Sequence, residues 1–293
     1  MRILVLGRSG QVGAALTHSL HGAGELIALD RAQLDLTQVD AIRTAFRELQ
    51  PQIVINAAAY TAVDAAESDS ATAFQINAEA PRIMAEEAER LGATLIHYST
   101  DYVFDGSKQD AWLEDDATAP LSVYGQSKLA GEQAIVAVGG SYLILRTSWV
   151  YGLYGKNFLL TMLRLAETRD ELSIVHDQLG APTWAVSIAD ATAAIIRESG
   201  EPAQLAALSG IYHLCAGGHT SWFGFAQAIF AHASVSKKPK LRPITTAEYP
   251  TPAQRPHNSI LNTDKFRRTF GDLPDWDGAL QRCLALYATR DST

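Results

Sequence analysis

The stretch M-R-I-L-V-L-G-R-S-G-Q-V-G, residues 1–13, decides the fold. Ile3–Leu6 is an apolar run of strand length, and Gly7, Gly10 and Gly13 follow it at intervals of three before a segment of helical period. In this context the first glycine permits a tight turn, the second lets the backbone approach a pyrophosphate, and the third lets the helix pack closely on the strand. The stretch therefore predicts the first unit of a dinucleotide-binding fold, although an ordinary glycine-rich turn can carry the same spacing.

Short apolar runs alternate with longer helical segments along the first half of the chain. Further buried strands are predicted at Leu26–Leu29, Ile53–Ile55, Thr94–Tyr98 and Tyr142–Leu145. Helices are predicted at Gln11–His21, Val39–Leu49, Ala71–Leu91 and Val123–Val138. This alternation predicts an α/β fold, a Rossmann-like doubly wound parallel sheet with helices on both faces. Acid-then-base spacing from Asp40 to Arg43 and from Glu86 to Arg90 predicts ion pairs along exposed helix faces.

The character of the sequence changes past residue 150. Strand patterns continue at Leu172–Val175 and Ile211–Leu214, but residues 237–257 are rich in proline and polar loops. We therefore expect a dinucleotide-binding Rossmann-like domain at residues 1–150, with later returns from about 172–200. Residues 151–293 should form mainly a smaller C-terminal α/β lobe that binds the substrate.

Composition excludes several classes of protein. The 293 residues carry 24 basic and 32 acidic side chains, a net charge of −8, without a basic run that would indicate nucleic acid or an anionic membrane as partner. The apolar stretches are too short for a signal-peptide core or a membrane-spanning helix. Cys215 and Cys283 are too few for a disulfide framework or a metal-ligand set, so a cytoplasmic protein is expected.

The second strand ends near the residues that would select the cofactor. Asp30 follows Gly7 by 23 residues, close to the spacing of about 20 at which a carboxylate meets the adenosine ribose of NAD. Arg31 and Arg8 could instead pair with the extra phosphate of NADP, or be solvated surface charges. The choice between NADPH and NADH stays open, and use of both is compatible with the sequence.

A proton-transfer pair lies at the start of the helix at Val123–Val138. Tyr124 and Lys128 are one helical turn apart, so an ammonium would lie beside a phenol and, with an oxidised nicotinamide, lower its pKa. Thr100, at the end of the fourth strand, could hydrogen-bond a substrate carbonyl. Ser99 competes for that role, but side chains alternate along a strand, and Thr100 is our choice. A Tyr-x-x-x-Lys pair alone is also common among surface residues.

Together these motifs resemble the extended short-chain dehydrogenases/reductases, and within them the dTDP-4-dehydrorhamnose reductase family. The resemblance covers almost the whole chain. Besides the glycine-rich stretch, it rests on N-A-A-A-Y-T-A-V-D-A-A-E (56–67), Y-S-T-D-Y-V-F-D-G (98–106), Y-G-Q-S-K-L-A-G-E (124–132), R-T-S-W-V-Y (146–151), D-Q-L-G-A-P-T (177–183) and Y-P-T-P-A-Q-R-P-H-N-S (249–259).

The resemblance implies reduction of dTDP-4-dehydro-6-deoxy-L-mannose to dTDP-L-rhamnose with NADPH or NADH, the last step in making that sugar donor. The catalytic residues would be Tyr124, Lys128 and Thr100. The implied cofactor-binding residues are Gly7, Gly10, Gln11, Val12 and Gly13 at the phosphates, Asp30, Arg31, Asp35 and Leu36 at the adenosine end, Ala58, Ala59 and Thr61 at the middle, and Tyr124 and Lys128 at the nicotinamide.

Substrate contacts are carried over in the same way. The resemblance places Thr100, Asp101 and Trp149 against the substrate, although Trp149 could be a core aromatic residue. Arg255 is the candidate for the substrate diphosphate, because a planar guanidinium binds such a group through two donors. Its alternative is a loop arginine paired with a nearby acid.

The chain departs from the family pattern in one place. Some members carry an acidic residue on the first helix that helps bind Mg²⁺ at a dimer contact, whereas this chain has Ala14 and Ala15, which cannot ligate a metal. We therefore expect no metal site there, and a homodimer is allowed but not required.

Two other functions fit parts of the sequence. A nucleotide-sugar dehydratase or epimerase would use the same scaffold, but Thr100 and Asp101 are followed by Tyr102, so the second carboxylate of the dehydratases is missing. A regulatory subunit similar to that of methionine adenosyltransferase would keep the fold and bind a dinucleotide without catalysis.

Overall fold

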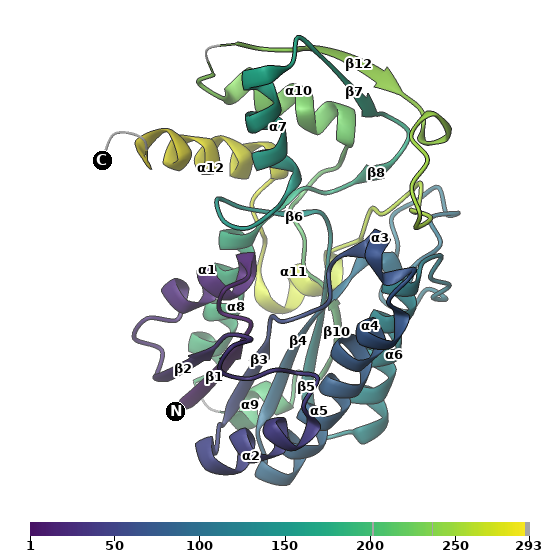
Figure 1. The fold of residues 1–293 in the computed structure, drawn as a ribbon. Helices are drawn as coiled ribbons and strands as arrows, with labels where there is room; N and C mark the ends of the chain where they lie inside the picture. Colours follow the sequence, from purple (N-terminus) through teal and green to yellow (C-terminus); the bar gives the residue numbers. More distant parts are fainter. Residues whose placement is uncertain (201, 236, 291–293) are drawn as a thin grey trace.

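A central parallel sheet organises the structure, a computed structural model that describes residues 1–200, 202–235 and 237–290 (Figure 1). Its six strands lie in the order β10-β5-β4-β3-β1-β2, and every neighbouring pair is parallel. The strands are β1 (Arg2–Leu6), β2 (Glu25–Leu29), β3 (Ile53–Asn56), β4 (Thr94–Thr100), β5 (Ser141–Thr147) and β10 (Gly210–His213). The predicted Rossmann-like doubly wound fold is confirmed.

Apolar side chains alternate between the two faces of this sheet, and helices cover both. On one face Ile96 and Tyr98 of β4 pack with α1 (Gln11–Ser19) and α8 (Ala185–Ser199). On the other, Leu95 packs with α2 (Val39–Leu49) and α5 (Ala80–Leu91). Because both faces are buried, the strands are apolar almost throughout, which explains why the sequence reveals them clearly.

One predicted helix is interrupted. The segment expected as a single helix at Ala71–Leu91 forms α4 (Ser70–Phe74), a π-helical turn at Gln75–Glu79, and α5. Within the π turn, the Asn77 side-chain amide bonds both backbone groups of Tyr60, with distances of 2.8 and 3.0 Å. The sequence prediction of an unbroken helix was therefore wrong in its middle, because this tertiary contact is not visible in the helical period.

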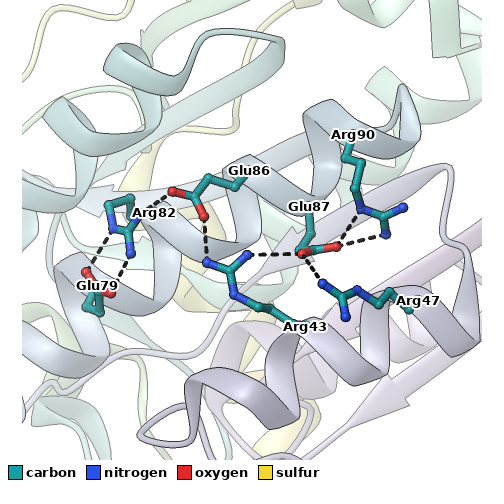
Figure 2. A network of polar contacts seen from close by, with 7 residues as sticks. All are labelled: Arg43, Arg47, Glu79, Arg82, Glu86, Glu87 and Arg90. Atoms are coloured by element: carbon teal, nitrogen blue, oxygen red, sulfur yellow. Dashed lines mark hydrogen bonds and ion pairs between the residues drawn. The ribbon is translucent and has the colours of Figure 1, made fainter.

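The arginines of the two expected pairs, Asp40–Arg43 and Glu86–Arg90, take other partners and join one network between α2 and α5, in which Arg90 pairs with Glu87 instead of Glu86 (Figure 2). Arg43 reaches across to Glu86 at 2.8 Å and Glu87 at 3.2 Å, rather than pairing within its own helix as expected. The buried Glu87 also pairs with Arg90 and Arg47. Several charges share partners here, so the network stabilises the helix pair more than isolated surface pairs would.

The second lobe lies above the carboxyl edge of the sheet in Figure 1 and has its own core. It comprises α7 (Phe158–Thr168), α10 (Trp222–His232), α12 (Trp276–Arg290) and the parallel pair β7 (Glu171–Val175) with β12 (Lys240–Ile244). Strand β12 falls within the proline-rich region that the sequence presented as loops. The chain returns to the central sheet through α8 and β10.

The remaining helices and strands complete the two lobes. They are α3 (Val63–Ala66), α6 (Val123–Val138), α9 (Pro202–Ala206), α11 (Asp264–Phe270), β6 (Val150–Tyr151), β8 (Leu179–Gly180), β9 (Thr183–Trp184) and β11 (Thr220–Ser221). In the described part of the chain, none of the helices combines the length and apolar character needed to cross a bilayer.

The contact between α1 and the glycine turn allows no side chain at Gly13. A Cβ at this position would lie 2.1 Å from the carbonyl oxygen of Gly7, a backbone atom that cannot move aside cheaply. Gly13→Ala should therefore lower the free energy of unfolding by about 1–3 kcal/mol. Gly278→Ala is the matched control, since Gly278 lies in α12 with open space around it. Denaturant unfolding should show this control equal to or more stable than wild type, and equal losses in both variants would contradict the packing argument.

Candidate active site

The candidate site lies where the sheet reverses its strand order. From β1 the chain passes to β2 on one side, and β3, β4 and β5 lie on the other, so the loops after β1 and β3 meet at the carboxyl edge. Gly7 has a φ of +84°, and a Cβ on it would come within 2.7 Å of the Ala58 backbone nitrogen. Open α/β sheets bind ligands in the crevice at such a reversal.

The glycine turn presents backbone donors at the start of α1. Gly10 is the N-cap residue, and the first intrahelical bond runs from the Ala14 N–H to its carbonyl at 2.9 Å. The N–H groups of Gln11, Val12 and Gly13 precede that bond, and the helix dipole adds positive potential there. The Gln11 side chain instead accepts a hydrogen bond from Asn157 at 2.8 Å, and so ties α1 to the second lobe. Val12 packs against the core.

At the end of β2 the candidate cofactor-selecting charges already have partners. Asp30 accepts hydrogen bonds from the backbone at Ala32 and Gln33, and Arg8 lies 3.5 Å from its carboxylate. Arg31 is exposed and lies 3.9 Å from Asp35.

The Asp35 carboxylate is engaged from a second side. It accepts from the backbone N–H and hydroxyl of Thr37, which hold the pKa of Asp35 below its ordinary value. Leu36 is buried in the core beside α2. Both arginine side chains are exposed; Arg8 lies beside Asp30, the acid expected at the adenosine ribose, and Arg31 lies beside Asp35.

Small residues follow β3. Ala58 and Ala59 are half-buried and Thr61 is exposed. The Asn56 side chain accepts from the Ala58 N–H at 3.2 Å and so holds the turn. The glycine turn and these small residues lie backbone against backbone at this edge of the sheet, which fits the close approach of an extended dinucleotide.

Tyr124 and Thr100 are brought together by α6 and β4. The Thr100 hydroxyl donates to Asp101 at 2.9 Å and lies close enough to the Tyr124 phenol to act on its pKa. The Ser99 hydroxyl is buried and, among the described residues, has no hydrogen-bond partner. The structure therefore places Thr100, and not Ser99, against the phenol.

Burial sets the electrostatics of this cluster. Desolvation raises the pKa of Tyr124 to about 12, while the bond to Thr100 acts in the opposite direction. Desolvation also raises the pKa of Asp101 to about 6, although Ser259, Thr100 and Ser148 favour its charged form. The lowering of the Tyr124 pKa expected from Lys128 is absent in the chain itself. A phenol with a high pKa stays protonated at neutral pH, which is the form that a proton donor in a reduction requires.

Lys128 is fully buried on the same helix. Its amine donates to the Tyr98 carbonyl at 2.6 Å and lies 3.0 Å from Nε2 of His97. Burial lowers the pKa of Lys128 to about 8, against a smaller opposite effect of Glu132.

Two proposed substrate contacts lie on the second lobe's side. Trp149 adopts a left-handed backbone conformation with φ of +46°, and its ring stacks on Trp222 at a centroid distance of 3.6 Å. Arg255 pairs with Asp64 at 2.8 Å and borders a cavity of about 260 Å³ formed by residues 246–257. The pairing with an acid, given as the alternative for Arg255, is the one seen in the structure.

Sequence reasoning missed two buried polar residues of the site, Asn77 and His97, and gave Asn56 only as the start of a run beside the adenosine, with no role for its side chain. Each is at most 1% exposed. Their signal is an isolated polar residue within an otherwise apolar strand or helix pattern, as at His97 in T-L-I-H-Y. Such residues must find partners when buried, so they mark places where polar groups converge.

Metal ligands do not gather near α1. Ala14 and Ala15 are half-buried, and within residues 1–200, 202–235 and 237–290 no group of three or more His, Cys, Asp or Glu side chains could hold a metal ion.

The raised pKa of Asp101 makes the free energy of unfolding depend on pH. Between the ordinary pKa of 3.8 and about 6, the folded chain binds a proton at Asp101 that the unfolded chain releases, so this group weakens folding as pH rises through that window. Asp101→Asn removes this effect. Its stability relative to wild type should rise by up to about 3 kcal/mol from pH 4 to pH 6.5. Urea unfolding at both pH values measures the difference, and a constant difference would contradict the shift.

Comparison with known proteins agrees with this geometry. Residues 1–289 match the family model described as RmlD substrate binding domain. Two dTDP-4-dehydrorhamnose reductases, from Burkholderia thailandensis and Escherichia coli, are 48% and 47% identical to the chain; each alignment covers 97% of it and 98% and 97% of the respective relatives. The crystal structure of a Bacillus anthracis dTDP-4-dehydrorhamnose reductase in complex with NADP is 36% identical, with a TM-score of 0.90 over 97% of this chain and 99% of that one. The chain therefore belongs to the RmlD substrate binding domain family, in which these dTDP-4-dehydrorhamnose reductases are its relatives.

Proposed function

We propose that this chain reduces the 4-keto group of dTDP-4-dehydro-6-deoxy-L-mannose (dTDP-4-dehydrorhamnose) to give dTDP-L-rhamnose, with NADPH or NADH as reductant. This is the last step in making that sugar donor. Family membership supports the substrate class, and the relative from Bacillus anthracis is described with NADP. The observation that carries the proposal is the Tyr124 phenol beside Thr100 at the carboxyl edge of the sheet, with buried Lys128 one turn along the helix.

The chain's own residues divide the work. The N–H groups of Gln11, Val12 and Gly13 would hold the cofactor phosphates, and the alanines after β3 would lie along its middle. When bound, the cofactor supplies the hydride.

Thr100 would hydrogen-bond the substrate carbonyl, and Tyr124 would give its proton to the carbonyl oxygen. Asp101 and Trp149 would contact the sugar. Arg255 would exchange Asp64 for the substrate diphosphate, because a guanidinium can bind either group through two donors.

We assign the dinucleotide to residues 1–150, with α8 and β10 as returns, and the sugar nucleotide mainly to residues 151–293. Within the second range, residues 201, 236 and 291–293 lie outside the described part of the chain. A cytoplasmic location and a homodimer both stay predictions.

Two alternatives are weaker. Elimination of water needs a second carboxylate, and the residue after Asp101 is Tyr102, whose pKa is raised by burial so that it is a poor base. A purely regulatory, dinucleotide-binding subunit would have no use for a phenol near a threonine hydroxyl and one helical turn from a buried amine.

One assay separates these functions. The protein is mixed with dTDP-4-dehydrorhamnose and either NADPH or NADH, the absorbance of the reduced cofactor is followed, and the sugar product is identified. Oxidation of one cofactor per dTDP-L-rhamnose formed supports the proposal. Normal cofactor binding without turnover would overturn it and favour the regulatory role.

Removal of the phenol oxygen should abolish proton donation. Tyr124→Phe should lower kcat by about 10²–10⁴-fold with little change in cofactor affinity, because the ring stays in place. Steady-state kinetics and cofactor titration measure the two effects. A variant that keeps near wild-type turnover would refute Tyr124 as the donor.

The two neighbouring hydroxyls of β4 provide a matched pair. Thr100→Val should lower kcat by about 10- to 100-fold, since it removes one hydrogen bond to the carbonyl. Ser99→Ala should leave kcat near wild type, because the Ser99 hydroxyl is buried without a partner among the described residues. The reverse ranking would show that the wrong hydroxyl has been assigned.

The arginines near Asp30 test cofactor choice. If Arg8 and Arg31 bind the extra phosphate of NADP, Arg8→Gln with Arg31→Gln should raise KM for NADPH by about tenfold or more and leave KM for NADH nearly unchanged. Equal changes for both cofactors would mean that the two arginines serve only the local ion pairs with Asp30 and Asp35.

A further inference from the structure

Beneath the amine of Lys128 lies a chain of polar groups that the proposed reaction does not use. Nζ of Lys128 is 3.0 Å from Nε2 of His97, and Nδ1 of His97 is 3.0 Å from Nδ2 of Asn56. The three residues come from α6, β4 and β3, and their exposed fractions are 2%, 0% and 1%. A histidine with a partner on each ring nitrogen and no contact with solvent has its proton placed by those partners.

The backbone determines which way the Asn56 amide points. Its oxygen accepts the N–H of Ala58 at 3.2 Å, so its NH₂ group faces Nδ1 of His97. Nδ1 must then be the acceptor. Burial and the nearby Lys128 hold the pKa of His97 well below its usual range, so the ring is neutral and carries its one proton on Nε2.

The proton on Nε2 of His97 favours an uncharged amine on Lys128. The Nε2–H of His97 and an ammonium on Lys128 would be two donors facing each other. A neutral amine resolves the conflict, because it accepts from Nε2–H and still donates to the Tyr98 carbonyl at 2.6 Å. The ammonium fits only if the imidazole proton moves to Nδ1 and the Asn56 amide turns, which leaves the Ala58 N–H facing another donor.

We propose that Asn56 and His97 form a positioning unit for Lys128, which fixes the place of its amine and favours the uncharged form. The inference rests on the proposed function for its catalytic meaning, because the ammonium is the form that would stabilise a phenolate at Tyr124. His97 touches the amine and not the reacting atoms, so it acts through Lys128. The unit makes the lysine proton easy to lose near neutral pH.

Other ionisable groups lie on the elements packed around Lys128. They are Tyr124 and Glu132 on α6, Asp101 and Tyr102 in the turn after β4, and Arg146 on β5. Glu132 raises the pKa of Lys128, but its carboxylate is itself bonded to Arg146 at 2.7 Å, both side chains being buried. The largest effect on Lys128 is burial, which favours the neutral amine as the proposed unit does.

Two substitutions should make Lys128 prefer the ammonium form, and each new side chain still occupies the space of the one it replaces. In Asn56→Asp, a carboxylate accepts from both Ala58 and Nδ1–H, so Nε2 of His97 becomes an acceptor for the ammonium. In His97→Gln, an amide oxygen near the former Nε2 does the same without adding charge. Each should raise the pKa of Lys128 by about one unit, so that the fall of kcat at high pH moves to higher pH by the same amount.

Thr192→Val is the control. It removes a buried hydrogen bond, the one between Tyr98 and Thr192 at 2.7 Å, on the opposite face of β4. It should leave the pH profile unchanged even if it lowers stability. A shift in this control equal to that of His97→Gln would mean that the profile reports general loosening of the strand, which would overturn the proposal.

The decisive measurement needs neither substrate nor cofactor. Nitrogen NMR of the wild-type protein with labelled histidine should find the His97 proton on Nε2, with the His97→Gln spectrum used for assignment. Labelled lysine should titrate at Lys128 at higher pH in both variants than in wild type. A proton on Nδ1, or an unchanged Lys128 titration in His97→Gln, would overturn the unit. A failed reduction assay with these NMR results intact would instead overturn only the proposed function.

Discussion

The site depends on how closely α6 approaches the rest of the fold. Two glycines make this approach possible. A Cβ at Gly125 would lie 2.3 Å from the Tyr102 carbonyl oxygen, and one at Gly131 would lie 2.1 Å from that of Asn77. Because backbone meets backbone at both points, the helix lies near enough to the sheet for the Lys128 side chain to reach His97 and the Tyr98 carbonyl.

This approach has an energetic cost that the surrounding groups offset. A buried amine or carboxylate loses its hydration, and each must regain hydrogen bonds inside the protein. Lys128 has two partners, and Asp101 is surrounded by hydroxyl groups. The carboxyl edge of the sheet therefore carries buried polar groups with shifted pKa values, and apolar side chains pack on both faces of β3, β4 and β5 beneath it. That combination suits proton donation to a carbonyl oxygen.

Much of this could be predicted from the sequence, for physical reasons. Strands buried on both faces are apolar throughout, so β1 to β5 were recognisable, and the spacing of the glycines identified the turn after β1. The pair of Tyr124 and Lys128 follows from helical geometry alone. Local patterns could not reveal partners on other elements. Arg43 pairs with α5 instead of Asp40, and Asn77 breaks a helix by holding the backbone of Tyr60.

The lysine environment shows the same limit from another side. The sequence supported an ammonium that lowers the pKa of the phenol, because only the spacing of the two residues was visible. The Lys128 amine bonds to His97 and the Tyr98 carbonyl on β4, and the groups that act on the Tyr124 pKa, Thr100 and Asp101, lie at the end of β4 and in the turn that follows it. Titration behaviour is a property of the assembled site and cannot be read from a helical repeat.

The most direct measurement of the central claim follows the hydride itself. The wild-type protein is incubated with dTDP-4-dehydrorhamnose and a reduced nicotinamide cofactor deuterated at its transferable position, and the sugar product is analysed by NMR and mass spectrometry. The account predicts dTDP-L-rhamnose with one deuterium at C4 for each cofactor oxidised. Recovery of unlabelled or unreduced sugar, with the cofactor bound but unchanged, would contradict it.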